Sequence, residues 1–111
     1  MPPETQEALQ RLQELISASE QGRIPWVQAN PSVFLWDVPN RARTTLQQLA
    51  PPPQSPNYIL QVVNPQNGMQ MLLLKGLDDP NLNTALHKLF SVINSGMNRT
   101  GLNFLSSLIP K

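Results

Sequence analysis

Two apolar runs separated by a polar turn signal constrain the fold of this chain more than any other feature. They occupy residues 58–63 and 69–74, and Asn-Pro-Gln-Asn-Gly lies between them. Short runs of apolar, β-branched and aromatic residues bounded by turn-forming residues predict strands. Asn67 and Gly68 tolerate positive φ, and Pro65 has no N–H to donate to a ladder, so the loop falls here. We therefore predict an antiparallel β-hairpin with strands at about 58–64 and 69–75.

The predicted hairpin is apolar on both of its faces. With the loop placed directly between the runs, Gln61 lies opposite Leu72 and Ile59 lies opposite Leu74 on one face. A hairpin that is solvated on one side alternates apolar and polar residues, whereas residues 71–74 are Met-Leu-Leu-Leu. A two-stranded ribbon is marginally stable by itself. We therefore expect helices on one face, and either more of this chain or a second chain, by dimerisation, to complete the other.

Helical periodicity is found on both sides of the hairpin. Apolar residues recur every three or four positions from Pro3 to Gln21, and Gly22 is a typical residue after a helix end. The widest apolar stripe follows Asp79-Pro80, a capping residue with proline at the first helical position, and ends at Gly96. We expect the core to be dominated by the apolar residues of this second stripe, which are Leu82, Ala85, Leu86, Leu89, Phe90 and Ile93.

Two prolines that follow capping side chains predict further helices in the first half of the chain. Asn30-Pro31 precedes the run at 32–36, for which we predict one or two helical turns. Asp37-Val38-Pro39 precedes apolar residues that share one helical face, so we predict a helix over residues 38–49.

The remaining segments complete the predicted fold. The prolines of residues 50–56 predict a stiff connector, residues 97–101 predict a turn, and residues 102–109 predict a short last helix. Residues 1–111 therefore read as a single small α+β domain, with three to four helices packed on the antiparallel hairpin.

Composition and charge exclude several classes of protein. Cysteine is absent, so disulfides, thiolate nucleophiles and cysteine metal sites cannot form. The formal net charge of +1 creates no long-range field for nucleic acid or anionic lipid. No apolar run approaches the roughly 20 residues of a membrane span, and the first residues lead us to expect no secretory signal. We expect a cytoplasmic protein that is free to self-associate because it carries little net charge.

No catalytic or metal-binding constellation is predicted. His87 and Ser91 fall on one face of a predicted helix, a spacing that is ordinary for two polar surface residues. Asp78 and Asp79 open the same helix, where a cap and first-turn charge explain them. The sequence contains neither of the glycine-rich motifs that bind phosphate groups, G-x-x-x-x-G-K-S/T and G-x-G-x-x-G. We therefore expect a protein that is not an enzyme and that needs no metal and no cofactor.

The pattern favours a non-catalytic protein-interaction module, such as an adaptor, an assembly factor or a subunit of a larger complex, with a homodimer as one form. Its protein partner, or a second copy, would contact the second face of the hairpin, where the candidates are Gln61, Leu72 and Leu74. The apolar C-terminal residues either cover this face or reach another chain; these are Phe104, Leu105 and Leu108. Both tryptophans, Trp26 and Trp36, are further candidates, either as core anchors or as partner contacts.

A small nucleic-acid-binding protein is the alternative, and its candidate residues are Arg41, Arg43 and Arg99. Such proteins cluster basic side chains with aromatic residues on one surface. The basic residues of this sequence are instead dispersed over the whole chain. Nucleic acid is therefore the weaker of the two partner classes.

Overall fold

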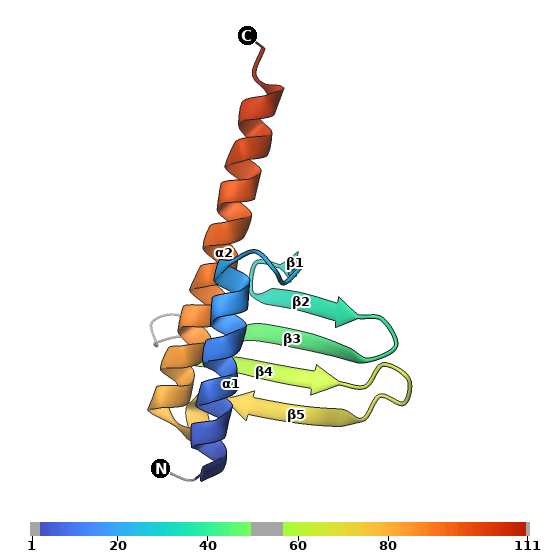
Figure 1. The fold of residues 1–111 in the computed structure, drawn as a ribbon, viewed down its shortest axis with the longest axis vertical. Helices are drawn as coiled ribbons and strands as arrows, with labels where there is room; N and C mark the ends of the chain where they lie inside the picture. The colour runs from blue at the N-terminus through green and yellow to red at the C-terminus, as the bar shows by residue number, and fades with distance from the viewer. Residues whose placement is uncertain (1–2, 50–56, 111) are drawn as a thin grey trace.

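The computed structural model describes residues 3–49 and 57–110. Within these residues, two helices and a 3-10 turn accompany five strands in the order α1 Pro3–Glu20, β1 Val27–Asn30, β2 Val33–Val38, β3 Ala42–Leu49, β4 Asn57–Val63, β5 Gln70–Lys75, η1 Gly76–Asp78 and α2 Pro80–Leu108. The strands form one antiparallel sheet in sequence order, from β1 to β5. The two helices lie side by side over one face of the sheet, run in the same direction and cross the strands steeply (Figure 1). The fold is therefore a two-layer α+β sandwich.

Helix α1 confirms the predicted first helix and ends as its sequence indicates. The N–H of Gly22 donates to the carbonyl of Ser19 at 3.1 Å, and the N–H of Arg23 donates to the carbonyl of Ala18 at 3.0 Å. Gly22 has a φ of 72°, a conformation that glycine adopts without the Cβ clash of other residues. These features make a Schellman motif, which satisfies the last carbonyls of the helix.

The two segments in which a proline follows a capping side chain, Asn30-Pro31 and Asp37-Val38-Pro39, lie at turns between strands. Their interpretation as helix starts is therefore wrong. Asn30 Oδ1 accepts a hydrogen bond from the N–H of Ser32 at 2.8 Å, which closes the turn between β1 and β2. After β2, the N–H of Arg41 donates to the carbonyl of Val38 at 3.0 Å. Asn40, which follows a proline, has a φ of 64°. Proline followed by asparagine at positive φ is the signature of a type II turn.

The predicted helices at 32–36 and 38–49 are therefore strands β2 and β3, and the expected fold of three to four helices on a hairpin is wrong, although the α+β class is correct. The spacing of Ala42 and Leu46 explains the error. Four residues make one helical turn, but they also make two full strand repeats, so both positions share a face in either structure. β-Branched Thr44 and Thr45 favour the strand. The predicted connector at 50–56 lies outside the described residues.

The predicted hairpin is confirmed as β4 and β5, but its register differs by one residue from the predicted register. Leu60 pairs with Leu74 and Val62 pairs with Leu72, whereas Gln61 pairs with Leu73. Next to the loop, the N–H of Asn64 bonds to the carbonyl of Met69 and Val63 pairs with Gln70, as in the predicted register, and the shift begins at a bulge between Val62 and Val63. A shift of one residue moves every side chain of a strand to the other face. Leu72 and Leu74 therefore lie on the helix-covered face, and Gln61 lies on the opposite face.

Helix α2 begins as predicted and continues much further than predicted. Asp79 Oδ1 accepts hydrogen bonds from the N–H groups of Asn81 at 2.8 Å and Leu82 at 3.4 Å, with Pro80 at the first helical position. The helix passes through Gly96 and Gly101, so the predicted turn at 97–101 and the separate helix at 102–109 are wrong. Glycine in a helix interior costs only about 1 kcal/mol relative to alanine, which does not by itself end a helix. In Figure 1, the last turns of α2 project beyond the sheet.

The core lies between the two helices and the covered face of the sheet. Phe34 packs against Phe90 with ring centroids 4.9 Å apart, and Tyr58 packs against the same ring at 5.4 Å. Each fully buried large apolar side chain contributes roughly 1.5 to 3 kcal/mol. The six predicted core positions of α2 are all buried, and they are joined by Leu12, Ile16, Phe34, Leu46, Tyr58 and Leu60.

Candidate functional site

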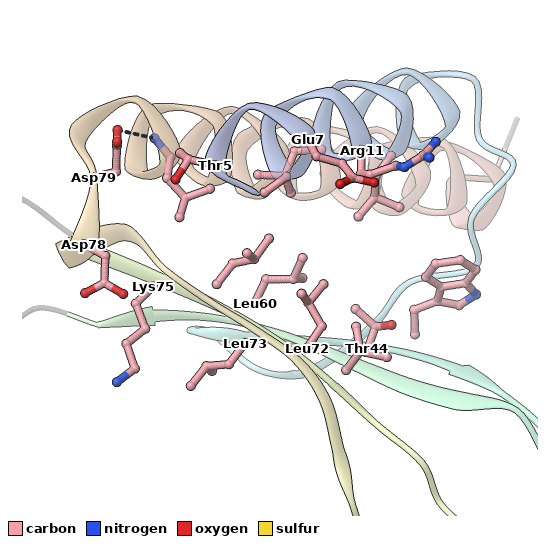
Figure 2. A pocket seen from close by; sticks show the side chains of 17 residues that line it. Thr5, Glu7, Arg11, Thr44, Leu60, Leu72, Leu73, Lys75, Asp78 and Asp79 are labelled. Atoms are coloured by element: carbon pink, nitrogen blue, oxygen red, sulfur yellow. Dashed lines mark hydrogen bonds between the residues drawn. The ribbon is translucent and has the colours of Figure 1, made fainter. Parts of the chain in front are cut away.

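A groove of about 680 Å³ lies between α1 and the β4–β5 side of the sheet. It forms because α1 packs chiefly on α2, which holds α1 beside the strands without closing the space below it. Figure 2 shows the side chains of Leu60 and Leu72 rising from the sheet toward α1 across this space. We call this space the α1 groove.

The floor and the roof of the α1 groove are apolar. Its floor consists of alternate residues of the two hairpin strands, which are Leu60 and Val62 from β4 and Leu72 and Leu74 from β5. Its roof is the narrow apolar stripe of α1, which contributes Ala8, Leu12 and Leu15. Leu72 on the edge strand is 44% exposed, which is unusual for a leucine on the covered face of a sheet. The groove is therefore open to other molecules at β5.

Charged side chains surround this apolar interior. Glu7 and Arg11 of α1 line one side, and Lys75, Asp78 and Asp79 line the side where β5 leads into α2 (Figure 2). Arg11 forms an ion pair with Glu14 at 3.3 Å, and Asp79 caps α2. In the part of the chain that the structure describes, Glu7 and Asp78 take part in no ion pair. Lys75 also takes part in neither of the ion pairs found among the described residues, so the rim, with three carboxylates and two basic side chains, is acidic by one charge.

The lining of the α1 groove is mostly apolar. Its hydroxyl groups belong to Thr5 and Thr44, and none of the residues that line it is a histidine, serine or cysteine. Apolar side chains with charges at the margin instead suit the burial of apolar groups from another molecule.

His87 lies outside the α1 groove and contacts a buried phenol. Tyr58 Oη lies 2.6 Å from His87 Nδ1 and accepts a hydrogen bond from Gln48 Nε2 at 3.2 Å. Burial raises the pKa of Tyr58, and the hydrogen bond from Gln48 opposes that rise. The arrangement satisfies the polar end of a core side chain, because a buried hydroxyl without partners is costly.

The predicted partner contacts are divided by the fold. Leu72, Leu74 and Trp36 come together in the α1 groove. Gln61 lies on the opposite face of the sheet, where its Nε2 donates to Gln70 Oε1 at 3.1 Å. Trp26 packs against the core and donates from Nε1 to Ser19 Oγ at 3.0 Å.

The remaining predicted contacts belong to the α2 extension, which we define as residues 98–109. Every side chain in this segment is exposed. Its apolar side chains are between 53% and 65% exposed, and they are Leu102, Phe104, Leu105, Leu108 and Ile109. The extension is thus a second apolar surface, distinct from the α1 groove.

The three arginines of the nucleic-acid alternative do not form one surface. Arg41 lies in the turn between β2 and β3, and Arg43 pairs with Asp37 at 3.3 Å on the neighbouring strand. Arg99 lies in the α2 extension, which projects beyond β1 and away from the turn between β2 and β3 (Figure 1). A phosphate backbone would need these charges along one continuous track.

Sequence reasoning missed the roof of the α1 groove. Ala8, Leu12 and Leu15 belong to a helical stripe that the sequence predicts, but periodicity does not indicate which strand a helix faces. The packing of α1 on α2, far apart in the sequence, decides this.

The comparisons with protein-family models, with curated proteins and with solved structures find no match for this chain. Neither described helix combines the length and the hydropathy needed to cross a membrane. Residues 3–49 and 57–110 also contain no group of three or more His, Cys, Asp or Glu side chains that could hold a metal ion.

Proposed function

We propose that this protein is a non-catalytic, cytoplasmic protein-interaction module, and that its α1 groove receives apolar side chains from a protein partner. The observation that carries the proposal is the groove itself, with its apolar interior of about 680 Å³ and the half-exposed Leu72 at its opening. Binding pockets in proteins commonly have volumes of about 300 to 1,000 Å³. An apolar trough with a charged rim suits an amphipathic segment, which places apolar residues inside and polar residues along the rim.

The rim favours a partner with positive charge next to its apolar residues. Glu7 and Asp78 carry negative charge that other described residues do not neutralise by an ion pair. Complementary charge increases the rate and specificity of association more than it increases the affinity. We expect such partners to bind faster at low ionic strength, because salt screens these exposed charges.

A peptide screen tests this function. A random-peptide phage library is selected on the wild-type protein and then compared on Leu72→Glu, which places a charge in the opening of the groove. We expect enriched peptides to be amphipathic and to bind at least about tenfold more weakly to Leu72→Glu, a difference of about 1.4 kcal/mol.

Met71→Glu is the matched control, because Met71 is also exposed and lies on the same strand but does not line the groove. Peptides selected on the wild type should bind Met71→Glu with unchanged affinity. If the enriched peptides bind Leu72→Glu as well as the wild type, the α1 groove is not a protein-binding site.

A further inference from the structure

We infer that the partner segment received by the α1 groove is the α2 extension of a second copy of this chain. The inference rests on the proposed function, because it names the occupant of the same groove. Three observations carry it: the pattern of the extension, its distance from the groove of its own chain, and the charges on both surfaces.

The α2 extension continues the apolar stripe of a buried helix without a cover of its own. Ile93 is buried and Met97 packs against the core, and the same helical face continues to Phe104 and Leu108 at spacings that keep residues aligned. The 11 helical residues from Asn98 to Leu108 span about 16 Å. Most of the stability of a helix in a protein comes from the packing of its apolar face, and this segment has only exposed side chains.

The extension cannot reach the groove of its own chain while α2 is continuous. Leu82, in the first turn of α2, lines the groove, and Phe104 lies 22 residues later in the same helix. This separation corresponds to about 33 Å along the axis. In Figure 1, α2 runs from the β5 side past β1 and away from the sheet. An extension that occupies an α1 groove must therefore occupy the groove of another copy.

The charges of the two surfaces are complementary in sign. Arg99 is the single charged residue of the α2 extension, which contains no Asp or Glu. The rim of the groove includes the carboxylates of Glu7 and Asp78. Such a rim favours an apolar segment whose charge is positive.

The buried area indicates that two copies exchange their extensions. Phe104, Leu105 and Leu108 share one face of the extension, and at roughly 100 Å² for each half-exposed large side chain they cover about 300 Å². The groove loses a smaller area, roughly 200 Å², so one contact buries about 500 Å² and a reciprocal pair about 1,000 Å². A specific interface should bury at least about 1,000 Å². A symmetric dimer with two such contacts reaches this minimum, whereas a single contact does not.

Light scattering over a range of protein concentrations tests the inference. We expect the wild type and the control Met71→Glu to be dimers. We expect Leu72→Glu, which damages the groove, and the double variant Phe104→Glu/Leu108→Glu, which damages the extension, to be monomers. All substituted positions are exposed, so circular dichroism should confirm that every variant is folded.

Mixing the two monomeric variants identifies the contact. Leu72→Glu retains an intact extension, and Phe104→Glu/Leu108→Glu retains an intact groove, so the mixture can form one of the two contacts. We expect a heterodimer with a dissociation constant at least tenfold higher than that of the wild-type dimer. A wild type that stays monomeric overturns the inference. A Leu72→Glu protein that stays dimeric also overturns it, because the extensions would then pair with each other.

The peptide screen separates this inference from the proposed function. It is repeated on Phe104→Glu/Leu108→Glu. The groove of this variant stays empty, because the substituted extension of a second copy cannot bind there. If this variant binds amphipathic peptides while the wild type is monomeric, the groove binds other proteins and the self-association is wrong. If this variant binds no peptide, the proposed function fails, whatever the mass of the wild type.

Discussion

Tyr58 links the sheet to α2 through both its backbone N–H and its side-chain hydroxyl. Its ring is 1% exposed, its Oη contacts His87 Nδ1 and Gln48 Nε2, and its N–H donates to Asn83 Oδ1 at 3.1 Å. Burial raises the pKa of this phenol above its ordinary value of 10.0, because the charged form is disfavoured in the core. It is the one tyrosine of the sequence, so its titration can be followed without interference from another phenol.

Tyr58→Phe should lower the free energy of unfolding by about 0.5 to 1.5 kcal/mol, because two hydrogen bonds are lost while His87 and Gln48 can still bond to water. The raised pKa adds a pH dependence. The neutral phenol stabilises the fold fully below about pH 10, and this contribution is lost as pH rises toward the pKa of the folded state. Urea unfolding at about pH 8 and about pH 11 measures both effects.

The same two measurements on Tyr58→Phe serve as the control for the pH effect. The free energy of unfolding of this variant should fall less between the two pH values than that of the wild type, since it has no phenol to ionise. An equal loss in both proteins would mean that other groups cause the alkaline sensitivity.

Gly76 and Gly96 should respond to alanine in opposite directions. A Cβ at Gly76 would collide with the side chain of Asn83, so Gly76→Ala should destabilise the protein by about 1 to 3 kcal/mol. A Cβ at Gly96 meets nothing within 4 Å, and Gly96 lies inside α2, so Gly96→Ala should stabilise it by about 0.5 to 1 kcal/mol. Thermal unfolding of both variants checks this, and a shift of the same sign in both would contradict it.

Helix α2 combines two segments with different protection from water. Residues such as Leu86 and Leu89 are completely buried, whereas the α2 extension is exposed on all sides. A single element can therefore contain both the most stable and the least stable helical turns of the molecule. Local stability follows local packing, so an unbroken helix does not imply uniform protection.

Hydrogen exchange should reveal this difference. In dilute solution, the amides of residues 98–108 should exchange within seconds, whereas those near Leu86 and Leu89 should be protected as strongly as the global fold allows. Raising the protein concentration should slow exchange in the extension of the wild type. Phe104→Glu/Leu108→Glu should show no such change, and slowing in that variant would contradict a role for these side chains.

The sequence predicts elements best where one local signal has one meaning. Asp79-Pro80 opens a helix and Gly22 ends one, and both predictions are confirmed. Asn30-Pro31 fits either a helix start or a tight turn. Apolar residues spaced four apart, such as Ala42 and Leu46, share one face in a helix and in a strand alike. The choice between them depends on the sheet that β2 and β3 join, which no local pattern contains. The same limit applies to the α1 groove, where Leu72 was identified but the opposing residues of α1 were not.

The molecule as a whole is a continuous antiparallel meander between two helices that lie far apart in the sequence. Neighbouring strands are also neighbours along the chain, so the sheet needs only local connections. The contact between α1 and α2 is instead formed across the entire sheet. The α1 groove follows from this arrangement, because α1 packs chiefly on α2.

This arrangement has a consequence for synthesis on the ribosome. All five strands emerge before α2, so the apolar face containing Phe34, Leu46 and Leu60 is complete before its main cover exists. At about 5 to 20 residues per second, the 29 residues of α2 take a few seconds to follow. During that interval the nascent sheet resembles the surfaces that chaperones bind. A messenger RNA that slows translation within the α2 codons would therefore lower the yield of folded protein more than one that slows it within α1.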